Sequence, residues 1–238
     1  MMDFDPQVVA KNVAAVQTRI AAAAARASRR SEDVTLVAIS KTFPAAAIRS
    51  AWDAGVRHFG ENRVQEWETK RDEVAGLAAT WHLVGHLQSN KARRAAALFH
   101  AVDSVDSLDL ARRLDVAIAA EAGAAAPRRL RVLLEVRLAP EVTKSGAEPA
   151  ALEALARGVL ALSHLDLAGL MCIPPPAQDP QDMRHYFRRL RELRDTLIFA
   201  LGVPLPVLSM GMSHDFEVAI EEGATEVRVG SAIFGARG

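Results

Sequence analysis

The sequence predicts a single domain of the α/β class, a (β/α)8 TIM barrel that spans residues 1–238, on three observations. The length of 238 residues is close to the roughly 250 residues that are typical of such barrels. Half of the residues are hydrophobic, so a large core can form. Short apolar runs alternate along the chain with longer amphipathic runs, which is the pattern of parallel βαβ units.

The expected strands are short apolar runs, and the expected helices are the amphipathic runs between them. Eight strands are predicted, at residues 34–40, 57–60, 81–85, 101–105, 130–138, 167–173, 207–210 and 226–229. Helices are predicted at residues 45–54, 63–77, 90–98, 107–122, 149–162, 180–200 and 216–222. Asp179 and Pro180 favour a helix start, because an acidic N-cap precedes proline at the first helical position. Eight such strands favour a closed barrel over an open sheet.

The eighth strand lacks a full helix after it, since only residues 231–238 follow. A long amphipathic helix is predicted instead near the N-terminus, over residues 6–27. We expect this extra helix to cover the gap on the outside of the barrel. No linker-like segment marks a second domain.

Composition excludes several classes of protein. The 29 basic and 29 acidic side chains balance, which argues against a nucleic-acid-binding protein. No apolar run reaches the ~18 residues of a membrane-spanning helix, and charged residues interrupt the segment where a secretory signal would lie. A single cysteine, Cys172, excludes an internal disulfide and suits a reducing compartment. We expect a cytoplasmic protein without nucleic-acid or membrane partners, and a monomer, because no apolar helix stripe remains uncovered.

Lys41 ends the first predicted strand and is the first candidate for chemistry. A lysine at the end of a buried strand is poorly hydrated, which lowers its pKa and frees the amine as a nucleophile. Such a lysine can form a Schiff base with an aldehyde such as pyridoxal phosphate (PLP). The alternative is a lysine that merely reaches solvent at a strand end.

The loops after the seventh and eighth strands have the composition of a phosphate site. Residues 209–213 read Ser-Met-Gly-Met-Ser, and Gly230 and Ser231 follow the eighth strand. Glycines let backbone N–H groups approach an anion, and serine hydroxyls add donors. Phosphate sites of barrels frequently lie at these two loops. The alternative is a pair of ordinary glycine turns.

Arg228 lies inside the eighth strand between two valines. Strand alternation places the valines on one face and Arg228 on the other, so the guanidinium should point into the barrel and needs a partner there. That partner could be a pyridine nitrogen of a bound ligand, or a salt bridge to Glu61 or Glu226. A permanently protonated donor at a pyridine nitrogen would leave the ring a weak electron sink.

The remaining lysines and histidines have weaker signals. Lys11 and Lys70 fall in predicted helices and are expected on solvated faces. Lys91 and Lys144 fall in strand-end loops, where they could pass on a cofactor or hold an anion, although Lys91 also fits an ordinary basic helix face. His82 is expected in the core, whereas His86 at a strand end could approach the site. No metal-ligand spacing is present, so no metal is expected.

Several motifs are long and specific. They are Val-Ala-Ile-Ser-Lys-Thr at 37–42, Phe-Gly-Glu-Asn-Arg-Val-Gln-Glu at 59–66, Trp-His-Leu-Val-Gly-His-Leu-Gln-Ser-Asn-Lys at 81–91, Lys-Ser-Gly at 144–146, Gly-Leu-Met at 169–171, and the run 208–237. With these motifs the whole chain resembles the PLP homeostasis proteins.

The resemblance implies an alanine-racemase-like barrel that binds PLP through a Schiff base on Lys41. It implies phosphate contacts and ring contacts from residues on the other strand ends. Phosphate contacts would come from Ser209, Met212, Ser213, Gly230 and Ser231. Arg228 would face the pyridine nitrogen, and Asn62 and Met171 would line the ring pocket.

Three functions remain for such a site. A racemase needs a base on each face of the planar intermediate. In alanine racemase the second base is a tyrosine from a second domain, which this chain lacks, and its only tyrosine, Tyr186, is expected on the barrel's exterior. The leading hypothesis is therefore a carrier that stores PLP and delivers it, possible recipients being PLP-dependent apoenzymes. The rival is an amino-acid racemase that uses His86 or Lys144, and a third hypothesis is a sugar-phosphate-binding barrel without a Schiff base.

Overall fold

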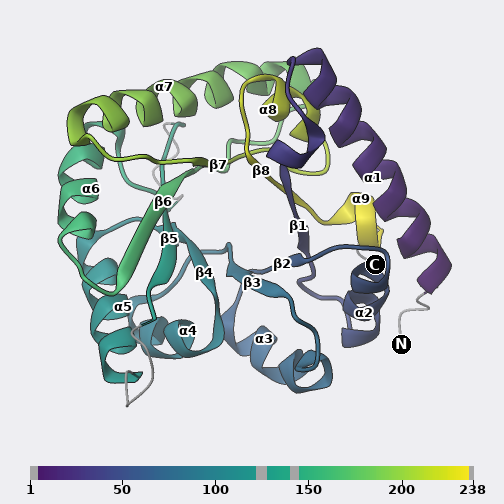
Figure 1. The fold of residues 1–238 in the computed structure, drawn as a ribbon, viewed down its shortest axis with the longest axis horizontal. Coiled ribbons are helices and arrows are strands. Elements are labelled where there is room, and N and C mark those ends of the chain that lie inside the picture. Colours follow the sequence, from purple (N-terminus) through teal and green to yellow (C-terminus); the bar gives the residue numbers. More distant parts are fainter. Residues whose placement is uncertain (1–4, 122–127, 140–144, 236–238) are drawn as a thin grey trace.

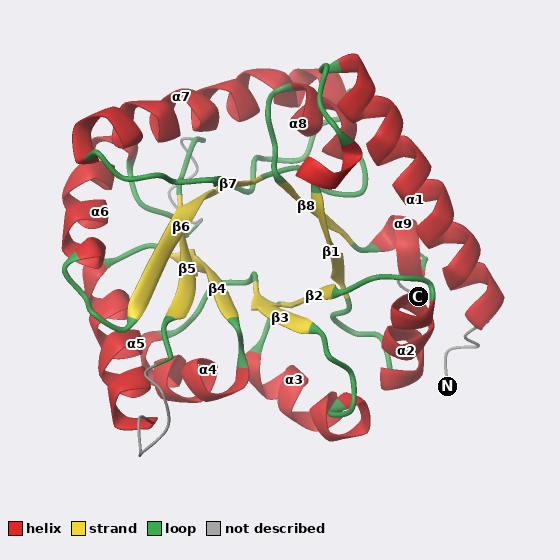
Figure 2. Cartoon of the chain, viewed as in Figure 1, coloured by secondary structure: helices red, strands yellow, loops and turns green. Residues whose placement is uncertain are grey.

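The computed structural model describes residues 5–121, 128–139 and 145–235 (Figure 1). Eight parallel strands form a closed barrel in the order of the chain, and strand β1 pairs with strand β8 to complete the ring. Helices surround the strands on the outside, as Figure 2 shows in red around yellow. The predicted (β/α)8 barrel is confirmed.

The strands lie close to the predicted ranges. Their bounds are β1 Thr35–Ile39, β2 His58–Glu61, β3 Thr80–Leu83, β4 Ala101–Val105, β5 Leu130–Glu135, β6 Leu165–Met171, β7 Val207–Ser209 and β8 Glu226–Val229. Two of them, β4 and β8, coincide with the prediction. The largest difference is at β5, which ends at Glu135 rather than at residue 138.

The helices also follow the prediction, with short 3-10 turns at several ends. The α-helices are α1 Pro6–Arg26, α2 Ala45–Asp53, α3 Val64–Lys70, α4 Ala92–Leu98, α5 Leu108–Glu121, α6 Leu152–Leu160, α7 Arg184–Leu201, α8 Phe216–Glu221 and α9 Ser231–Phe234. The 3-10 turns are η1 Ser31–Asp33, η2 Arg71–Val74, η3 Ser89–Lys91, η4 Pro149–Ala151 and η5 Pro180–Met183. The carboxylate of Asp179 accepts the Gln181 amide at 2.8 Å, which confirms the predicted helix start.

Helix α1 covers the gap that the short C-terminal helix α9 leaves. Its apolar side chains recur three or four residues apart, and Val9, Val13, Val16 and Ile20 are all buried. The helix packs against α2, α8 and α9, on the side of the barrel where β8 meets β1 (Figure 1). This placement confirms the expected role of the extra helix.

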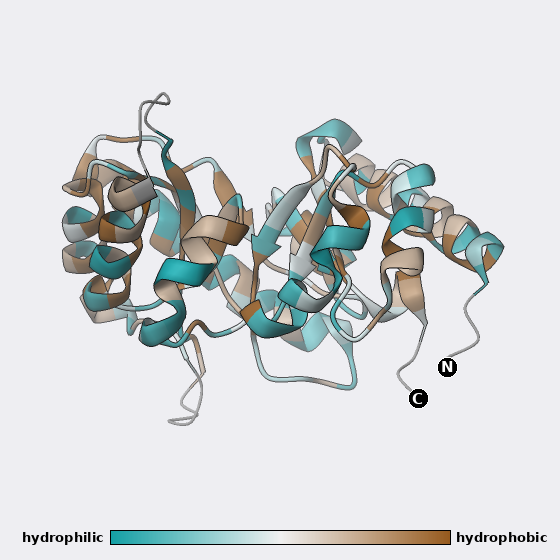
Figure 3. Ribbon diagram, turned by 90° about the horizontal axis from the view of Figure 1, so that it is seen from below, coloured by the Kyte–Doolittle hydropathy of each residue, from teal (hydrophilic) through white to brown (hydrophobic). Residues whose placement is uncertain are grey.

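The outer helices carry both hydrophobic and hydrophilic residues (Figure 3), as amphipathic helices on a barrel should. None of the helices in the described ranges has the length and hydropathy that crossing a lipid bilayer requires.

The interior of the barrel holds a polar cluster below its mouth. His82 Nδ1 lies 2.9 Å from Asp103 Oδ2, its Nε2 lies 3.0 Å from His58 Nδ1, and Arg131 pairs with Glu226 at 2.8 Å. Burial opposes a charge on His82, but the Asp103 carboxylate leaves its pKa raised. The side chain of His82 is fully buried, which confirms the expectation of a core histidine.

In the described part of the chain, the atoms of His82, Asp103 and Glu226 are also grouped closely enough to suggest metal ligands, within 4.8 Å of one another. A proton on His82, whose pKa is raised, together with the Arg131 guanidinium would offset the two carboxylate charges. Asp103 Oδ1 and Glu226 Oε1 have no hydrogen-bond partner within the described residues.

Candidate functional site

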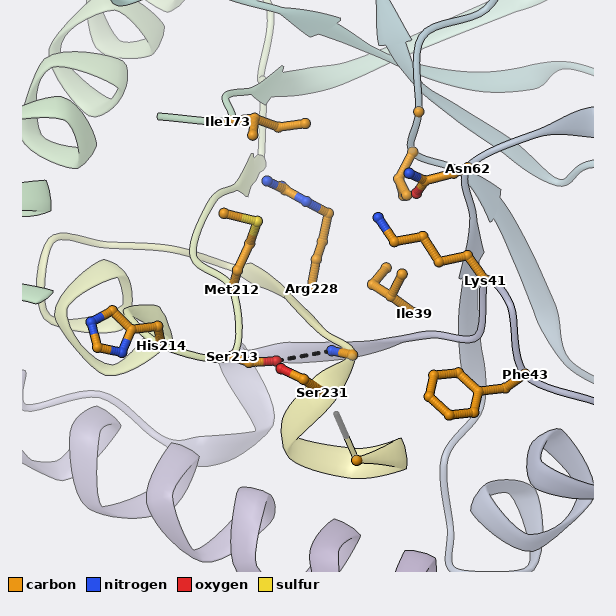
Figure 4. Close-up of a pocket in the computed structure, with 14 residues that line it drawn as sticks. Ile39, Lys41, Phe43, Asn62, Ile173, Met212, Ser213, His214, Arg228 and Ser231 are labelled. Atoms are coloured by element: carbon orange, nitrogen blue, oxygen red, sulfur yellow. Dashed lines mark hydrogen bonds between the residues drawn. The ribbon is translucent and has the colours of Figure 1, made fainter. Parts of the chain in front are cut away.

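A cavity of about 530 Å³ opens at the mouth of the barrel, where the carboxyl ends of the strands meet (Figure 4). Seven of the nine predicted site residues line it. These are Lys41, Asn62, Met212, Ser213, Arg228, Gly230 and Ser231. They come from four neighbouring strands, β7, β8, β1 and β2, so closure of the barrel brings together residues that are far apart in the sequence.

The side of the cavity at β7 and β8 is built from backbone donors and hydroxyl groups. Ser213 Oγ accepts hydrogen bonds from the amides of Gly230 at 3.1 Å and Ala232 at 3.3 Å (the first is the dashed line in Figure 4). Two amides therefore already converge on one oxygen position. Such a group of N–H donors, with Ser231 beside it, suits an anion such as a phosphate.

The turn that carries these residues depends on Gly211. Its φ of +90° lies in the region that favours glycine, and a Cβ at this position would lie 2.6 Å from the Cβ of Ala219. The turn is therefore packed closely against helix α8. A glycine is required here for both its backbone conformation and its lack of a side chain.

Arg228 lines the cavity from strand β8 and is only 3% exposed. Its Nη1 donates to Ser209 Oγ at 2.7 Å, and its Nη2 donates to the Cys172 carbonyl at 2.8 Å. The alternative prediction, a salt bridge from Arg228 to Glu61 or Glu226, is wrong. Glu61 pairs with Lys70 instead, and Glu226 pairs with Arg131.

Two predicted residues lie elsewhere. Ser209 is fully buried and accepts a hydrogen bond from Arg228, so it positions that side chain and does not line the cavity. Met171 also does not line it, because the side chain packs inside the barrel against Leu133 and Ala168. Ile173, two residues further toward the mouth, lines the cavity in its place.

Lys41 stands on the opposite side of the cavity, just after β1. Figure 4 shows its amino group extending into the cavity between Asn62 and Arg228. Apolar side chains that the sequence did not single out complete this wall, among them Ile39 and Phe43. The Phe43 ring packs against Phe234 at 5.0 Å between ring centres, and this contact joins the Lys41 turn to the C-terminal helix α9.

The position of Lys70 also differs from the prediction. The side chain was expected on a solvated helix face, but it is only 6% exposed and forms an ion pair with Glu61 at 2.8 Å. The sequence missed this pair because the partners lie on different elements, α3 and β2. The only local signal is Glu66, four residues before Lys70 on the same helix.

The other candidates within the described residues lie apart from Lys41. His86 and Lys91 line a neighbouring cavity of about 650 Å³ that shares Asn62 and Gly85 with the first. His86 lies 3.6 Å from Asp106. Tyr186 belongs to the outer helix α7, as expected. Lys144 lies outside the described residues.

The arrangement has a clear chemical meaning. An amine, a buried guanidinium and a group of N–H and hydroxyl donors face one cavity between apolar walls. A ligand that fits has a flat apolar body, an electrophilic carbonyl for the amine and an anionic group for the donors. PLP has all three features, and its pyridine nitrogen can accept a hydrogen bond from an arginine.

Comparison with known proteins agrees with this chemistry. The family model for the alanine racemase N-terminal domain matches residues 12–238. The PLP homeostasis protein of Pseudomonas aeruginosa is 47% identical over 96% of this chain and 96% of its own length. The protein of the same name from Aquifex aeolicus is 42% identical over 93% of this chain and 95% of its own.

Solved structures give the same result. PipY of Synechococcus elongatus, determined with PLP bound, is 39% identical, with a TM-score of 0.84 over 95% of this chain and 100% of its own. Alanine racemase of Corynebacterium glutamicum, at 18% identity, a TM-score of 0.70 and 62% of its own length covered, shares the fold. The chain belongs to the family of PLP homeostasis proteins.

Proposed function

We propose that this protein binds PLP covalently through Lys41 and serves in PLP homeostasis by storing the cofactor and delivering it. The observation that carries the proposal is a single cavity that contains Lys41, Arg228 and the donors of the β7 and β8 loops. The names of the relatives and the PLP in PipY support the choice of ligand.

Each side chain has a proposed role. The amine of Lys41 would hold the cofactor through its aldehyde, which is the chemistry that PLP supplies. Ser213, Gly230 and Ser231, with Met212, would bind the phosphate. Arg228, fixed by Ser209 and the Cys172 carbonyl, would donate to the ring nitrogen and keep it unprotonated. Asn62 would contact the ring from the side of Lys41.

The geometry favours a carrier over a racemase. Proton exchange at an amino-acid Cα on both faces needs a second base opposite Lys41. Among the described residues, Tyr186 is on the outer helix α7, and His86 lines the neighbouring cavity. Within the described ranges, no tyrosine or carboxylate side chain lines the Lys41 cavity, and the one imidazole that does, His214, has its Nε2 3.0 Å from the Gln178 carbonyl.

The proposal extends to partners and compartment. Storage is useful only if the cofactor can be handed on, so we propose PLP-dependent apoenzymes as recipients. We propose the cytoplasm as the compartment, in line with a sequence whose single cysteine forms no disulfide within the chain. We keep a monomer as the state in solution.

Transfer and exchange experiments test this function. PLP-loaded protein, freed of excess cofactor, is mixed with the apo form of a PLP-dependent enzyme, and recovery of that enzyme's activity is followed. We expect recovery without the protein itself exchanging the Cα hydrogen of amino acids in deuterium oxide. Exchange well above the free-PLP background that is lost in Lys41→Ala would establish the racemase instead.

A further inference from the structure

We propose that Lys70 is a positioning residue that holds the turn bearing Lys41 in the conformation needed for cofactor attachment. The inference rests on the proposed function of Lys41 and adds a residue from another element, helix α3. Lys70 does not line the Lys41 cavity, so its action is through the backbone of the turn.

The contacts of the Lys70 ammonium lie on both sides of Lys41. It donates to the carbonyl of Ser40 at 2.8 Å and to the carbonyl of Phe43 at 3.3 Å, which are the residues that begin and end the turn. Its ion pair with Glu61 supplies a third oxygen at 2.8 Å. An ammonium has three donors, so these three oxygens satisfy it.

The turn needs such support because its backbone is strained. Thr42, directly after Lys41, has a φ of +68°, which is unfavourable for a β-branched residue. Its amide donates to the carboxylate of Glu66, which is also on α3. Helix α3 therefore holds the strained turn at three points, through two contacts from Lys70 and one from Glu66.

Glu61 connects this cluster to the barrel. Its side chain is fully buried at the end of β2, and its Oε1 accepts a hydrogen bond from Ser40 Oγ at 2.5 Å as well as the Lys70 ion pair. Its Oε2 has no hydrogen-bond partner within the described residues. Loss of Lys70 would leave a buried carboxylate without its counter-charge, next to the turn.

A purely structural ion pair would have different consequences. It would contribute to stability but would leave the reactivity of Lys41 unchanged once the protein is folded. A positioning residue changes that reactivity, because a misplaced reacting group loses up to about 10²-fold in rate. The two roles are therefore separable by measurements on folded protein.

The main variants are Lys70→Met, which keeps the length of the side chain, and Lys70→Met combined with Glu61→Gln, which removes both buried charges and guards against unfolding. Glu66→Ala removes only the contact to Thr42. Lys11→Met, at an exposed position on α1, is the matched lysine control. Folding is checked by circular dichroism and thermal melting.

The readouts are the rate of Schiff-base formation with PLP, its pH profile, and the absorption maximum of the bound cofactor. We expect the rate to fall about tenfold or more in both Lys70 variants, with an altered pH profile, and to fall less in Glu66→Ala. Lys11→Met should match the wild type.

Wild-type rates and pH profiles in the folded double variant and in Glu66→Ala would overturn the positioning role. Failure of the proposed function would look different, since the wild type itself would then form no Schiff base on Lys41.

Discussion

The two sides of the cavity are built on different principles. At β7 and β8, backbone amides and the hydroxyl of Ser213 bond to one another across two neighbouring loops. At β1, the turn around Lys41 is held by two charged side chains of a different element, the buried Lys70 and the partly exposed Glu66 of α3. The proposed anion site thus depends on local turn chemistry, whereas the proposed placement of the amine depends on a long-range ion cluster.

The largest expected effect comes from a substitution on the Lys41 side of the cavity alone. Lys41→Arg keeps a positive charge but cannot form a Schiff base, so covalent attachment should be lost completely. The donors of β7 and β8 remain, so weak non-covalent binding should persist. Absorbance together with equilibrium dialysis measures both quantities. Equal affinity in variant and wild type would mean that the amine contributes nothing.

The next largest effect tests how closely the loop after β7, on the other side of the cavity, is packed. Gly211→Ala adds a Cβ to a residue with positive φ at 2.6 Å from another Cβ, so we expect a loss of about 2–4 kcal/mol in the free energy of unfolding. Gly202→Ala is the control, because its φ is also positive but nothing lies within 4 Å. It should lose only about 1 kcal/mol. Urea denaturation compares the two, and similar losses would contradict close packing at Gly211.

The pH dependence of stability tests the polar cluster in the barrel interior, which lies below both sides of the mouth. Burial, followed by the nearby His82, lowers the pKa of His58 from 6.5 to about 4. A lowered histidine pKa means that the unfolded chain binds the proton more readily, so stability should fall as the pH drops from about 6.5 to 4. His58→Gln should flatten this part of the stability curve. An unchanged slope would show that another group titrates there.

The smallest expected effect comes from Ser213, in the same loop after β7. Ser213→Ala removes the acceptor of the Gly230 and Ala232 amides and should cost about 1 kcal/mol of stability. Affinity for PLP should fall modestly, because a bound phosphate can take over both amides. Calorimetric titration with PLP and with inorganic phosphate measures the change. A complete loss of binding would mean that the hydroxyl itself is the main phosphate ligand.

Local patterns were sufficient to predict most of the fold and one side of the site. Alternating apolar and amphipathic runs predicted the eight strands and the N-terminal helix, and Gly-Ser loops at strand ends predicted residues such as Ser213 and Gly230. Lys70 was misplaced because its partners, Glu61 and the Ser40 carbonyl, come close only in the folded barrel. Ser209 and Met171 sit one layer deeper than expected, since strand ends alone do not define how far the cavity extends.

The most direct test of the Lys41 site is borohydride reduction of the protein incubated with PLP, followed by peptide mapping, with Lys41→Arg as the control. We predict a yellow protein whose reduced label resides on the peptide that contains Lys41, and an unlabelled variant. A label that is absent, or that is spread over Lys91 and other lysines in both proteins, would contradict the assignment of Lys41.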